Sequence, residues 1–202
     1  MSKITVDTIE PSTGTTVTLG GSGDTLSVPS GVTLDVASGG TITNSGTASG
    51  FGLFSSYAVI ADQKSQNTHG GTFTAGAWQT RDLNTEVFDP DSIVSISTNA
   101  FTLAAGTYFI RWQAPAGNCN YHQSRLYNSS DSSVVAVGSS EMAHSSYSVT
   151  NKSFGSCRVT IAASKAFIIQ HQCSTTANSE GFGRAENFGT EQYTTIEIFK
   201  EA

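Results

Sequence analysis

The sequence predicts an all-β protein, built mainly as an antiparallel sandwich of short strands. Ser and Thr make up about a quarter of the 202 residues and only 13% of residues are charged, so the usual helix formers are scarce. Short apolar segments alternate with turn residues, and no segment shows a clear helical period of apolar residues. This length fits one sandwich of ordinary size plus an extension.

The first fifty residues contain no aromatic side chain and repeat a short unit. Ser-Gly pairs recur every seven or eight residues, at Gly23, Gly31, Gly39 and Gly46. Between the pairs, apolar residues keep their positions: Leu26, Leu34 and Ile42, and Val28 and Val36. Each unit has too few apolar side chains to offset the entropy of ordering it. We therefore expect residues 16–50 to form a thin β shaft in which three chains wind around one axis, the alternative being a flexible linker.

Residues 1–15 form a predicted attachment segment. Ile4, Val6 and Ile9 alternate as in a strand before Pro11, and this piece is expected to dock onto a larger assembly.

Residues 51–202 form the predicted sandwich domain. Its clearest strand spans 107–114, where Tyr108, Ile110 and Trp112 face a core, and Gly106 bends the chain into it. Further strands are expected at 56–60, 101–103, 121–127, 134–137, 157–161, 167–173 and 193–199. A polar, Gly-rich passage separates the first strand from the central ones.

Two motifs carry a family resemblance: F-x-L-x-x-G-x-Y from Phe101, and E-x-Y-T-x-I-E-I-x-K from Glu191. Both resemble strands of the tumour-necrosis-factor-like jelly roll, which is also the fold of complement globular heads. With the runs GGTFTAGAWQTRDLNT and GRAENFGTE, residues 51–202 resemble the C-terminal domains of bacteriophage tail or head fibre proteins. The resemblance implies a homotrimeric jelly-roll head and localisation in a virion.

The sequence carries no catalytic or cofactor signature. It has no G-x-S-x-G elbow, phosphate-binding loop, H-E-x-x-H or dinucleotide fingerprint, so we expect no enzyme activity and no cofactor. Asp89 and Asp91 lie close together, but a proline turn explains them better than a glycosidase pair or a calcium site, and no metal is expected. The three cysteines are expected to be small buried hydrophobes; if two paired, Cys157 and Cys173 would be favoured as neighbours.

Charge and hydropathy exclude two partner classes. A net charge of −6 and a pI near 5.0 oppose nucleic-acid binding, which needs a basic surface. No apolar run is long enough to cross a bilayer, and the start MSKITVDTIE has no apolar signal region. We expect synthesis in a cytoplasm without membrane insertion.

One outward strand face is a candidate ligand site. With Leu126 pointing inward, the strand 121–127 displays two tyrosines, a glutamine and an arginine together, which suits a sugar or another polar ligand. An ordinary inter-subunit surface is equally compatible. Trp78 and the loop 143–148 are further candidates, because projecting loops often carry recognition. The predicted ligand-binding set is Trp78, Tyr121, Gln123, Arg125, Tyr127 and Tyr147.

Other outward faces predict a trimer interface. Phe109 and Phe199 would be unfavourable in water, and neighbouring charged residues would compensate one another around a threefold axis. The predicted interface residues are Phe109, Arg111, Arg158, Tyr193, Glu197 and Phe199. The alternative is that loops of the same subunit cover the aromatic residues.

These features predict a trimeric viral fibre or adhesin whose head binds a receptor on a bacterial surface, with a glycan as the expected receptor. Its expected partners are two further copies of the chain, the host receptor and, through the N-terminal segment, other virion proteins. The alternative is a structural virion component, such as a decoration, cement or collar fibre, that binds other virion proteins. A polysaccharide depolymerase is disfavoured, since it would need placed carboxylates.

Overall fold

The computed structural model describes residues 9, 11, 13–41, 43 and 53–202, and the chain divides into two units, Met1–Thr47 and Ala48–Ala202. Ile4, Val6, Ile42 and the predicted domain boundary at Gly50 lie outside the described residues. Residues 13–41 contain turns and bends but no strand, so the β shaft stays a prediction. The second unit is called the head below.

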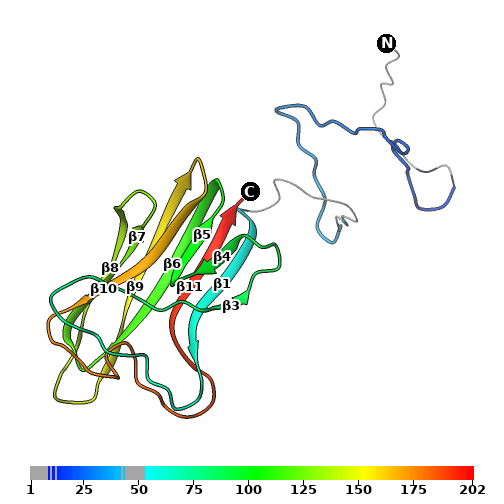
Figure 1. Cartoon of the computed structure of the whole chain (residues 1–202). Coiled ribbons are helices and arrows are strands. Elements are labelled where there is room, and N and C mark those ends of the chain that lie inside the picture. Colours follow the sequence, from blue (N-terminus) through cyan, green and yellow to red (C-terminus); the bar gives the residue numbers. More distant parts are fainter. Residues whose placement is uncertain (1–8, 10, 12, 42, 44–52) are drawn as a thin grey trace. The chain divides into compact units, whose positions relative to one another are not determined.

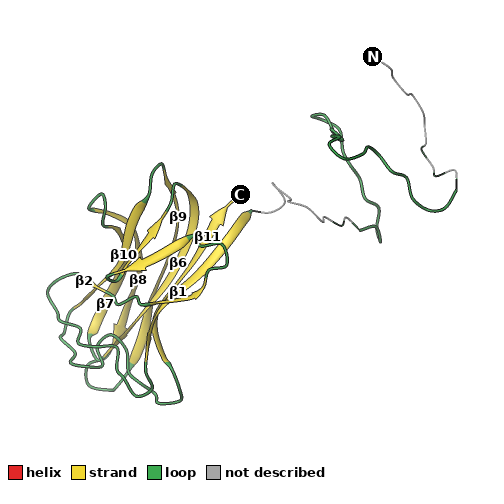
Figure 2. Cartoon of the chain, turned by 45° about the vertical axis from the view of Figure 1, so that its right-hand side comes forward, coloured by secondary structure: helices red, strands yellow, loops and turns green. Residues whose placement is uncertain are grey.

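The head contains eleven strands, and the described residues include no helix (Figures 1 and 2). The all-β prediction is therefore confirmed. The strands are β1 (Phe54–Lys64), β2 (Gln79–Thr80), β3 (Thr85–Phe88), β4 (Val94–Ser97), β5 (Ala100–Leu103), β6 (Gly106–Gly117), β7 (Asn120–Asn128), β8 (Ser133–Ala143), β9 (Thr150–Ile161), β10 (Lys165–Cys173) and β11 (Glu191–Glu201).

The strands form two antiparallel sheets that pack face to face. Sheet 1 has the order β3-β1-β11-β6-β9 and sheet 2 the order β4-β5-β10-β7-β8, with β2 paired to β10. From β5 onward the chain changes sheet at each connection except the β7–β8 hairpin. This winding is a jelly roll, as the resemblance implied. The last strand, β11, lies between β1 and β6 in the middle of its sheet.

Three predicted strands were much too short, and one of them, 56–60, extends to Phe54–Lys64. The strands expected at 134–137 and 157–161 extend to Ser133–Ala143 and Thr150–Ile161. Their added residues include Gly138 and Ser153, where β8 and β9 of the two sheets approach closely, and Gly155, which leaves room for the Trp112 ring of the neighbouring strand. The polar passage after β1 also contains two short strands, β2 and β3.

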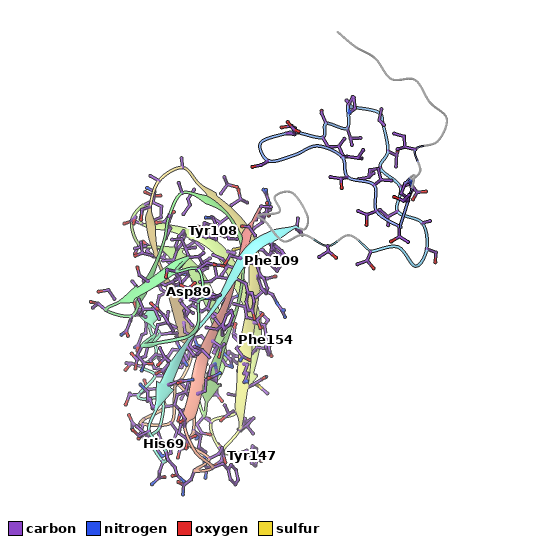
Figure 3. The ribbon with its side chains drawn as sticks, turned by 90° about the vertical axis from the view of Figure 1, so that its right-hand side faces the viewer. His69, Asp89, Tyr108, Phe109, Tyr147 and Phe154 are labelled. Carbon is purple, nitrogen blue, oxygen red and sulfur yellow. The ribbon has the colours of Figure 1, made fainter. Side chains whose placement is uncertain are left out.

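The core follows the alternation predicted for 107–114. Tyr108, Ile110 and Trp112 are buried between the sheets, whereas Phe109 lies on the outer face of sheet 1 (Figure 3). The rest of the main core comes from β1, β5, β7, β10 and β11, including Ile60, Phe101, Leu126, Phe167, Ile169, Ile196 and Ile198.

A buried chain of hydrogen bonds joins the sheets beside Trp112. Its indole Nε1 donates to Ser124 Oγ at 2.8 Å, and Ser124 Oγ lies 2.8 Å from Ser153 Oγ. The Ser153 hydroxyl then donates to the Ser139 carbonyl at 2.7 Å. Trp112 and Gly155 are cross-strand neighbours, and a Cβ added to Gly155 would lie 1.9 Å from the indole ring. The indole therefore occupies the space that a side chain at this position would need.

A second, smaller core lies at the end of the head where β6 ends and β7 begins. It contains Phe73, Cys119, Cys173 and Phe182, and the fully buried Arg81 packs with its Cζ 4.2 Å from the Phe182 ring centroid. Arg81 Nη2 donates to the Phe182 carbonyl and Nε to Thr194 Oγ1, both at 2.8 Å. One buried cation thus fixes the long β10–β11 connection to β11.

The three cysteines are free; Cys119 and Cys173 are buried as expected, whereas Cys157 is only half-buried. The suggested neighbours are wrong: β9 and β10 lie in different sheets, so Cys157 is not beside Cys173. Cys119 shares the smaller core with Cys173, and the adjacent Cys173 thiol together with burial raises the pKa of the Cys119 thiol.

Replacing Gly155 by Ala should lower the free energy of unfolding by about 2–3 kcal/mol, because the new methyl group must displace the buried indole. Urea unfolding of both proteins at one concentration measures this. Ser156→Ala, at the next position of β9, is the matched control and should change stability by less than about 0.5 kcal/mol. Equal stability of Gly155→Ala and Ser156→Ala would contradict this role of Gly155.

Candidate functional site

Trp78 and Arg125 stack on the outer face of sheet 2. The Arg125 Cζ atom lies 3.9 Å from the Trp78 ring centroid and 5.4 Å from the Tyr127 ring centroid. Arg125 Nε donates to Oε1 of Gln170 on the neighbouring strand β10 at 2.8 Å. The guanidinium is therefore held between two aromatic rings and an amide while part of it remains accessible.

A groove of about 720 Å³ lies beside this stack. Trp78, Tyr121 and Gln123 of the predicted ligand-binding set line it. Sequence reasoning missed its other lining residues, which are His122, Ser140, Glu141, Met142, Asn151, Gln172, Cys173 and Ser174. Gln172 lies directly opposite Gln123 in the β10–β7 register, so the alternation of residues 167–173 was a signal that could have found it.

The groove offers the chemistry of a polar-ligand site. Two aromatic rings supply flat apolar surfaces, and the carboxamides and hydroxyls supply both donors and acceptors. Gln123 Nε2 already donates to the Gly138 carbonyl at 3.0 Å and lies 3.2 Å from Ser140 Oγ, which fixes its orientation. Fixed amides beside aromatic rings suit a polyhydroxylated ligand. We call the groove together with Trp78, Arg125 and Tyr127 the Trp78 face.

Tyr147 is not part of the Trp78 face. It lies in the β8–β9 loop with 72% of its surface exposed and stacks on His144, with ring centroids 4.6 Å apart. Figure 3 shows it at the end of the head opposite Tyr108, the same end as His69. The structure thus brings together five of the six predicted ligand-binding residues.

A buried histidine pair lies on the core side of β7 and β10. His122 Nδ1 and His171 Nε2 are 2.9 Å apart, while His122 Nε2 and His171 Nδ1 have no hydrogen-bond partner. Burial lowers the pKa of His122 to about 4, with the Arg81 charge lowering it further and Glu141 opposing. Burial and Arg81 also lower the pKa of His171. Both rings are therefore neutral near pH 7.

The outer face of sheet 1 carries five aromatic rings in contact. Ring centroids are 5.2 Å apart for Phe54 and Phe199, 4.8 Å for Tyr57 and Phe88, and 5.9 Å for Tyr57 and Phe199. Phe109 lies 6.4 Å from Phe199. We call these five residues the aromatic face. Of them, sequence reasoning identified Phe109 and Phe199 but missed Phe54, Tyr57 and Phe88.

The charged residues around the aromatic face are paired within one chain. Arg111 Nη1 lies 3.1 Å from Glu197 Oε2. Arg158 makes two contacts of 2.7 Å with Glu201, which sequence reasoning had not included. The sequence analysis expected charges to compensate one another around a threefold axis; the structure instead pairs both arginines within one chain, on the same sheet face.

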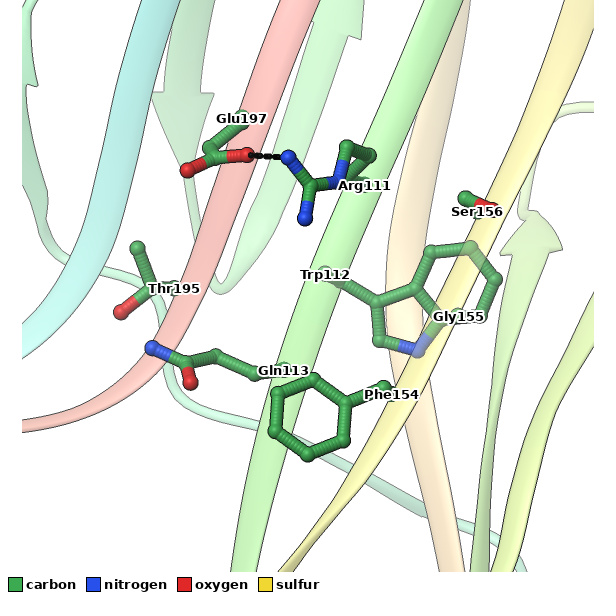
Figure 4. Close-up of a pocket in the computed structure, with 8 residues that line it drawn as sticks. All are labelled: Arg111, Trp112, Gln113, Phe154, Gly155, Ser156, Thr195 and Glu197. Carbon is green, nitrogen blue, oxygen red and sulfur yellow. Dashed lines mark ion pairs between the residues drawn. The ribbon is translucent and has the colours of Figure 1, made fainter.

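A recess of about 320 Å³ opens beside the Arg111–Glu197 pair (Figure 4). Gln113, Thr195 and Phe154 also line it. Phe154 is exposed and lies N-terminal to the predicted bounds of its strand, which is why sequence reasoning missed it. The recess lies along β6 and β9 and is lined by both apolar and polar side chains.

Tyr193 was predicted to lie at the trimer interface, and the structure corrects this prediction. Its side chain is buried, and its hydroxyl donates to the Thr68 carbonyl at 2.6 Å. A Cβ added to Gly183 would lie 2.2 Å from the Tyr193 ring, so the β10–β11 connection covers it closely. The side chain of Tyr193 is therefore covered within its own chain and does not belong to the exposed part of this face.

Within the described residues, no group of three or more His, Cys, Asp or Glu side chains is placed to hold a metal ion. The same residues include no helix long and apolar enough to span a membrane.

No protein-family model and no curated protein sequence matches this chain. Among solved structures, the chain is similar to Eiger TNF from S. frugiperda, with 12% identity, a TM-score of 0.48, and coverage of 74% of this chain and 94% of that chain. It is also similar to the globular domain of zebrafish complement 1qA protein (17% identity, TM-score 0.43, 71% and 95% covered) and to murine APRIL at pH 8.0 (7% identity, TM-score 0.46, 72% and 98% covered). The jelly-roll assignment rests on the strand order of the two sheets.

Stability should fall as the pH drops from about 6.5 toward 4, since the unfolded chain protonates His122 near its ordinary pKa while the folded chain resists protonation until about pH 4. The expected loss from this residue is about 2–3 kcal/mol, measured by urea unfolding at pH 7 and at successively lower pH.

The His122→Asn variant, which keeps a polar atom near His171, is the comparison for this experiment. It should lose less stability than the wild type over the same pH range. An unchanged pH dependence in this variant would contradict the assignment to His122.

Proposed function

We propose that this chain is a homotrimeric fibre-type virion protein whose head binds a receptor on the surface of a host bacterium, with a glycan as the receptor. The observation that carries the proposal is the Trp78 face. It combines a guanidinium held between two aromatic rings with a groove lined by amides and hydroxyls, built mainly on sheet 2. Sugar rings stack on aromatic side chains through their apolar faces while their hydroxyls bond to amides and guanidinium groups.

Self-association is supported by the aromatic face. Tyr57, Phe54 and Phe88 are each more than a third exposed, and they adjoin one another on sheet 1 rather than being scattered. The neighbouring charges are already paired, so burying this face against a second copy leaves no charge without a partner. The occupant we assign to it is another copy of this chain.

The two faces lie on different sheets, so association through sheet 1 leaves the Trp78 face on sheet 2 accessible. Three copies then present three Trp78 faces to one cell surface. Linked weak sites raise the effective concentration of one another and prolong attachment. A virion location is supported by the resemblance of residues 51–202 to fibre heads, and the segment 1–15 is the proposed contact with other virion proteins.

A charge placed on the aromatic face should weaken the trimer. Tyr57→Glu should raise the protein concentration at which half of the trimer has dissociated by about tenfold or more, because burying an unpaired carboxylate is costly. Light scattering over a dilution series measures the mass relative to the 21.1 kDa chain.

Val134→Glu is the matched control for this substitution, because Val134 lies on sheet 2 and is exposed to a similar extent as Tyr57. It should leave the dissociation unchanged. A wild-type protein that stays at the mass of one chain would refute the trimer.

Removing the stacked residues should reduce cell binding without unfolding the head. Trp78→Ala and Arg125→Ala should each lower the amount of fluorescently labelled protein bound to a susceptible bacterial strain by about tenfold, because a stacking contact worth about 1 kcal/mol is lost at each of three sites. Arg184→Ala removes an exposed arginine from the β10–β11 connection and should bind like the wild type.

Periodate oxidation of the cells tests the receptor class, because it destroys glycan diols and should abolish binding. Binding that survives periodate would overturn the proposal that the receptor is a glycan. A trimer that binds no strain in a broad panel would favour the structural virion component instead.

A further inference from the structure

The first unit repeats one turn three times at a strict spacing of eight residues. Backbone N–H groups donate to the carbonyls three residues earlier: Asp24 to Gly21 at 3.1 Å, Val32 to Pro29 at 3.1 Å and Gly40 to Ala37 at 2.8 Å. The accepting carbonyls belong to residues 21, 29 and 37. The sequence repeat is therefore also a repeat of backbone geometry.

Each turn has a glycine at the same position. The third turn residues, Gly23, Gly31 and Gly39, have φ values of 89°, 81° and 88°, whereas the serines before them have no positive φ. A positive φ at the third position alone is the pattern of a type II turn, which favours glycine there. The Ser-Gly pairs seen in the sequence are thus the central residues of the turns.

Between the turns the chain has no regular secondary structure and leaves apolar side chains exposed. Leu26 and Leu34 are 68% and 67% exposed, and Val28 and Val36 are 44% and 41% exposed. If these segments become extended strands, residues two apart point to the same side, so each repeat would present its Leu and its Val together. Two apolar side chains in the first repeat and three in the second, which adds Val32, are too few for a core within one chain, so this surface requires a partner.

The spacing of these apolar side chains indicates which partner would fit them. A row of Leu and Val pairs recurring every eight residues is matched by another row with the same period, and this segment carries such a row. Only two residues between 13 and 41 are charged, Asp24 and Asp35, so identical copies repel one another little. Asp24 Oδ2 also accepts the backbone N–H of Gly21 at 2.6 Å within the first turn.

We propose that the partner of residues 21–41 is the same segment of other copies of the chain, aligned turn to turn so that Leu26, Val28, Leu34 and Val36 of neighbouring chains bury one another. The turns form within each chain and set the register, and order between the turns arises on association. The number of copies, three, rests on the proposed function. This segment is then an association device that acts separately from the aromatic face of the head.

Amide hydrogen exchange of the full-length protein tests this proposal. At concentrations where light scattering shows the trimer, amides of residues 24–36 should exchange at least tenfold more slowly than in an unstructured chain. This protection should disappear on dilution to the monomer. The double variant Leu26→Ser with Leu34→Ser should lose the protection at every concentration.

The matched control is Ser27→Ala with Asp35→Asn, which changes residues that would lie on the opposite side of the same segments once these are extended, and should keep the protection. A trimer whose residues 24–36 exchange like an unstructured chain would make this segment a linker and overturn the proposal, while leaving the proposed trimeric head intact. Protection that persists in the monomer would equally overturn it, because no second copy would then be needed. A monomer at all concentrations would overturn both proposals.

Discussion

The close approach of the two sheets at Trp112 is the constraint on which the rest of the head depends. The indole lies over Gly155 within its own sheet and donates across the core to Ser124 in the other. The buried residues next to it in this layer are small: Ser124 accepts its hydrogen bond, and a Cβ on Gly138 would lie 2.6 Å from Ser124 Oγ. The polar atoms buried by this arrangement bond to one another, so the interior tolerates them. The sheets are thereby fixed in distance and register along β6, β7, β8 and β9.

Fixing the sheets gives the head two rigid outer faces with different chemistry. On sheet 1, aromatic rings adjoin one another and nearby charges are paired, which favours burial against another apolar surface. On sheet 2, Arg125 remains partly accessible between aromatic rings and amides, which favours a polar ligand. Buried Arg81 adds to this rigidity at one end, where it fixes the β10–β11 connection over the smaller core. The proposed association and the proposed recognition therefore use separate surfaces.

The two units of the chain differ in how their backbone groups form hydrogen bonds and in whether their apolar side chains are buried. The head closes a core from side chains that are far apart in sequence. Residues 13–41 instead rely on local turns and leave their apolar side chains exposed. The change in composition at the first aromatic residue, Phe51, reflects this physical difference, since aromatic side chains supply most of the area that a small core buries. The chain thus combines a domain that has its own core with a segment whose apolar side chains are exposed in the single chain.

The sequence by itself determined the strand faces. Two-residue alternation was enough to place Tyr108 inside and Phe109 outside, and to group Tyr121, Gln123, Arg125 and Tyr127, because the pleat of a strand fixes where each side chain points. Only the tertiary structure decided which distant residues meet those faces. It brought Trp78 onto Arg125, added Phe54, Tyr57 and Phe88 to the aromatic face, and covered Tyr193 with a loop. Such contacts depend on strand order and on the paths of long connections, and local periodicity carries no information about either.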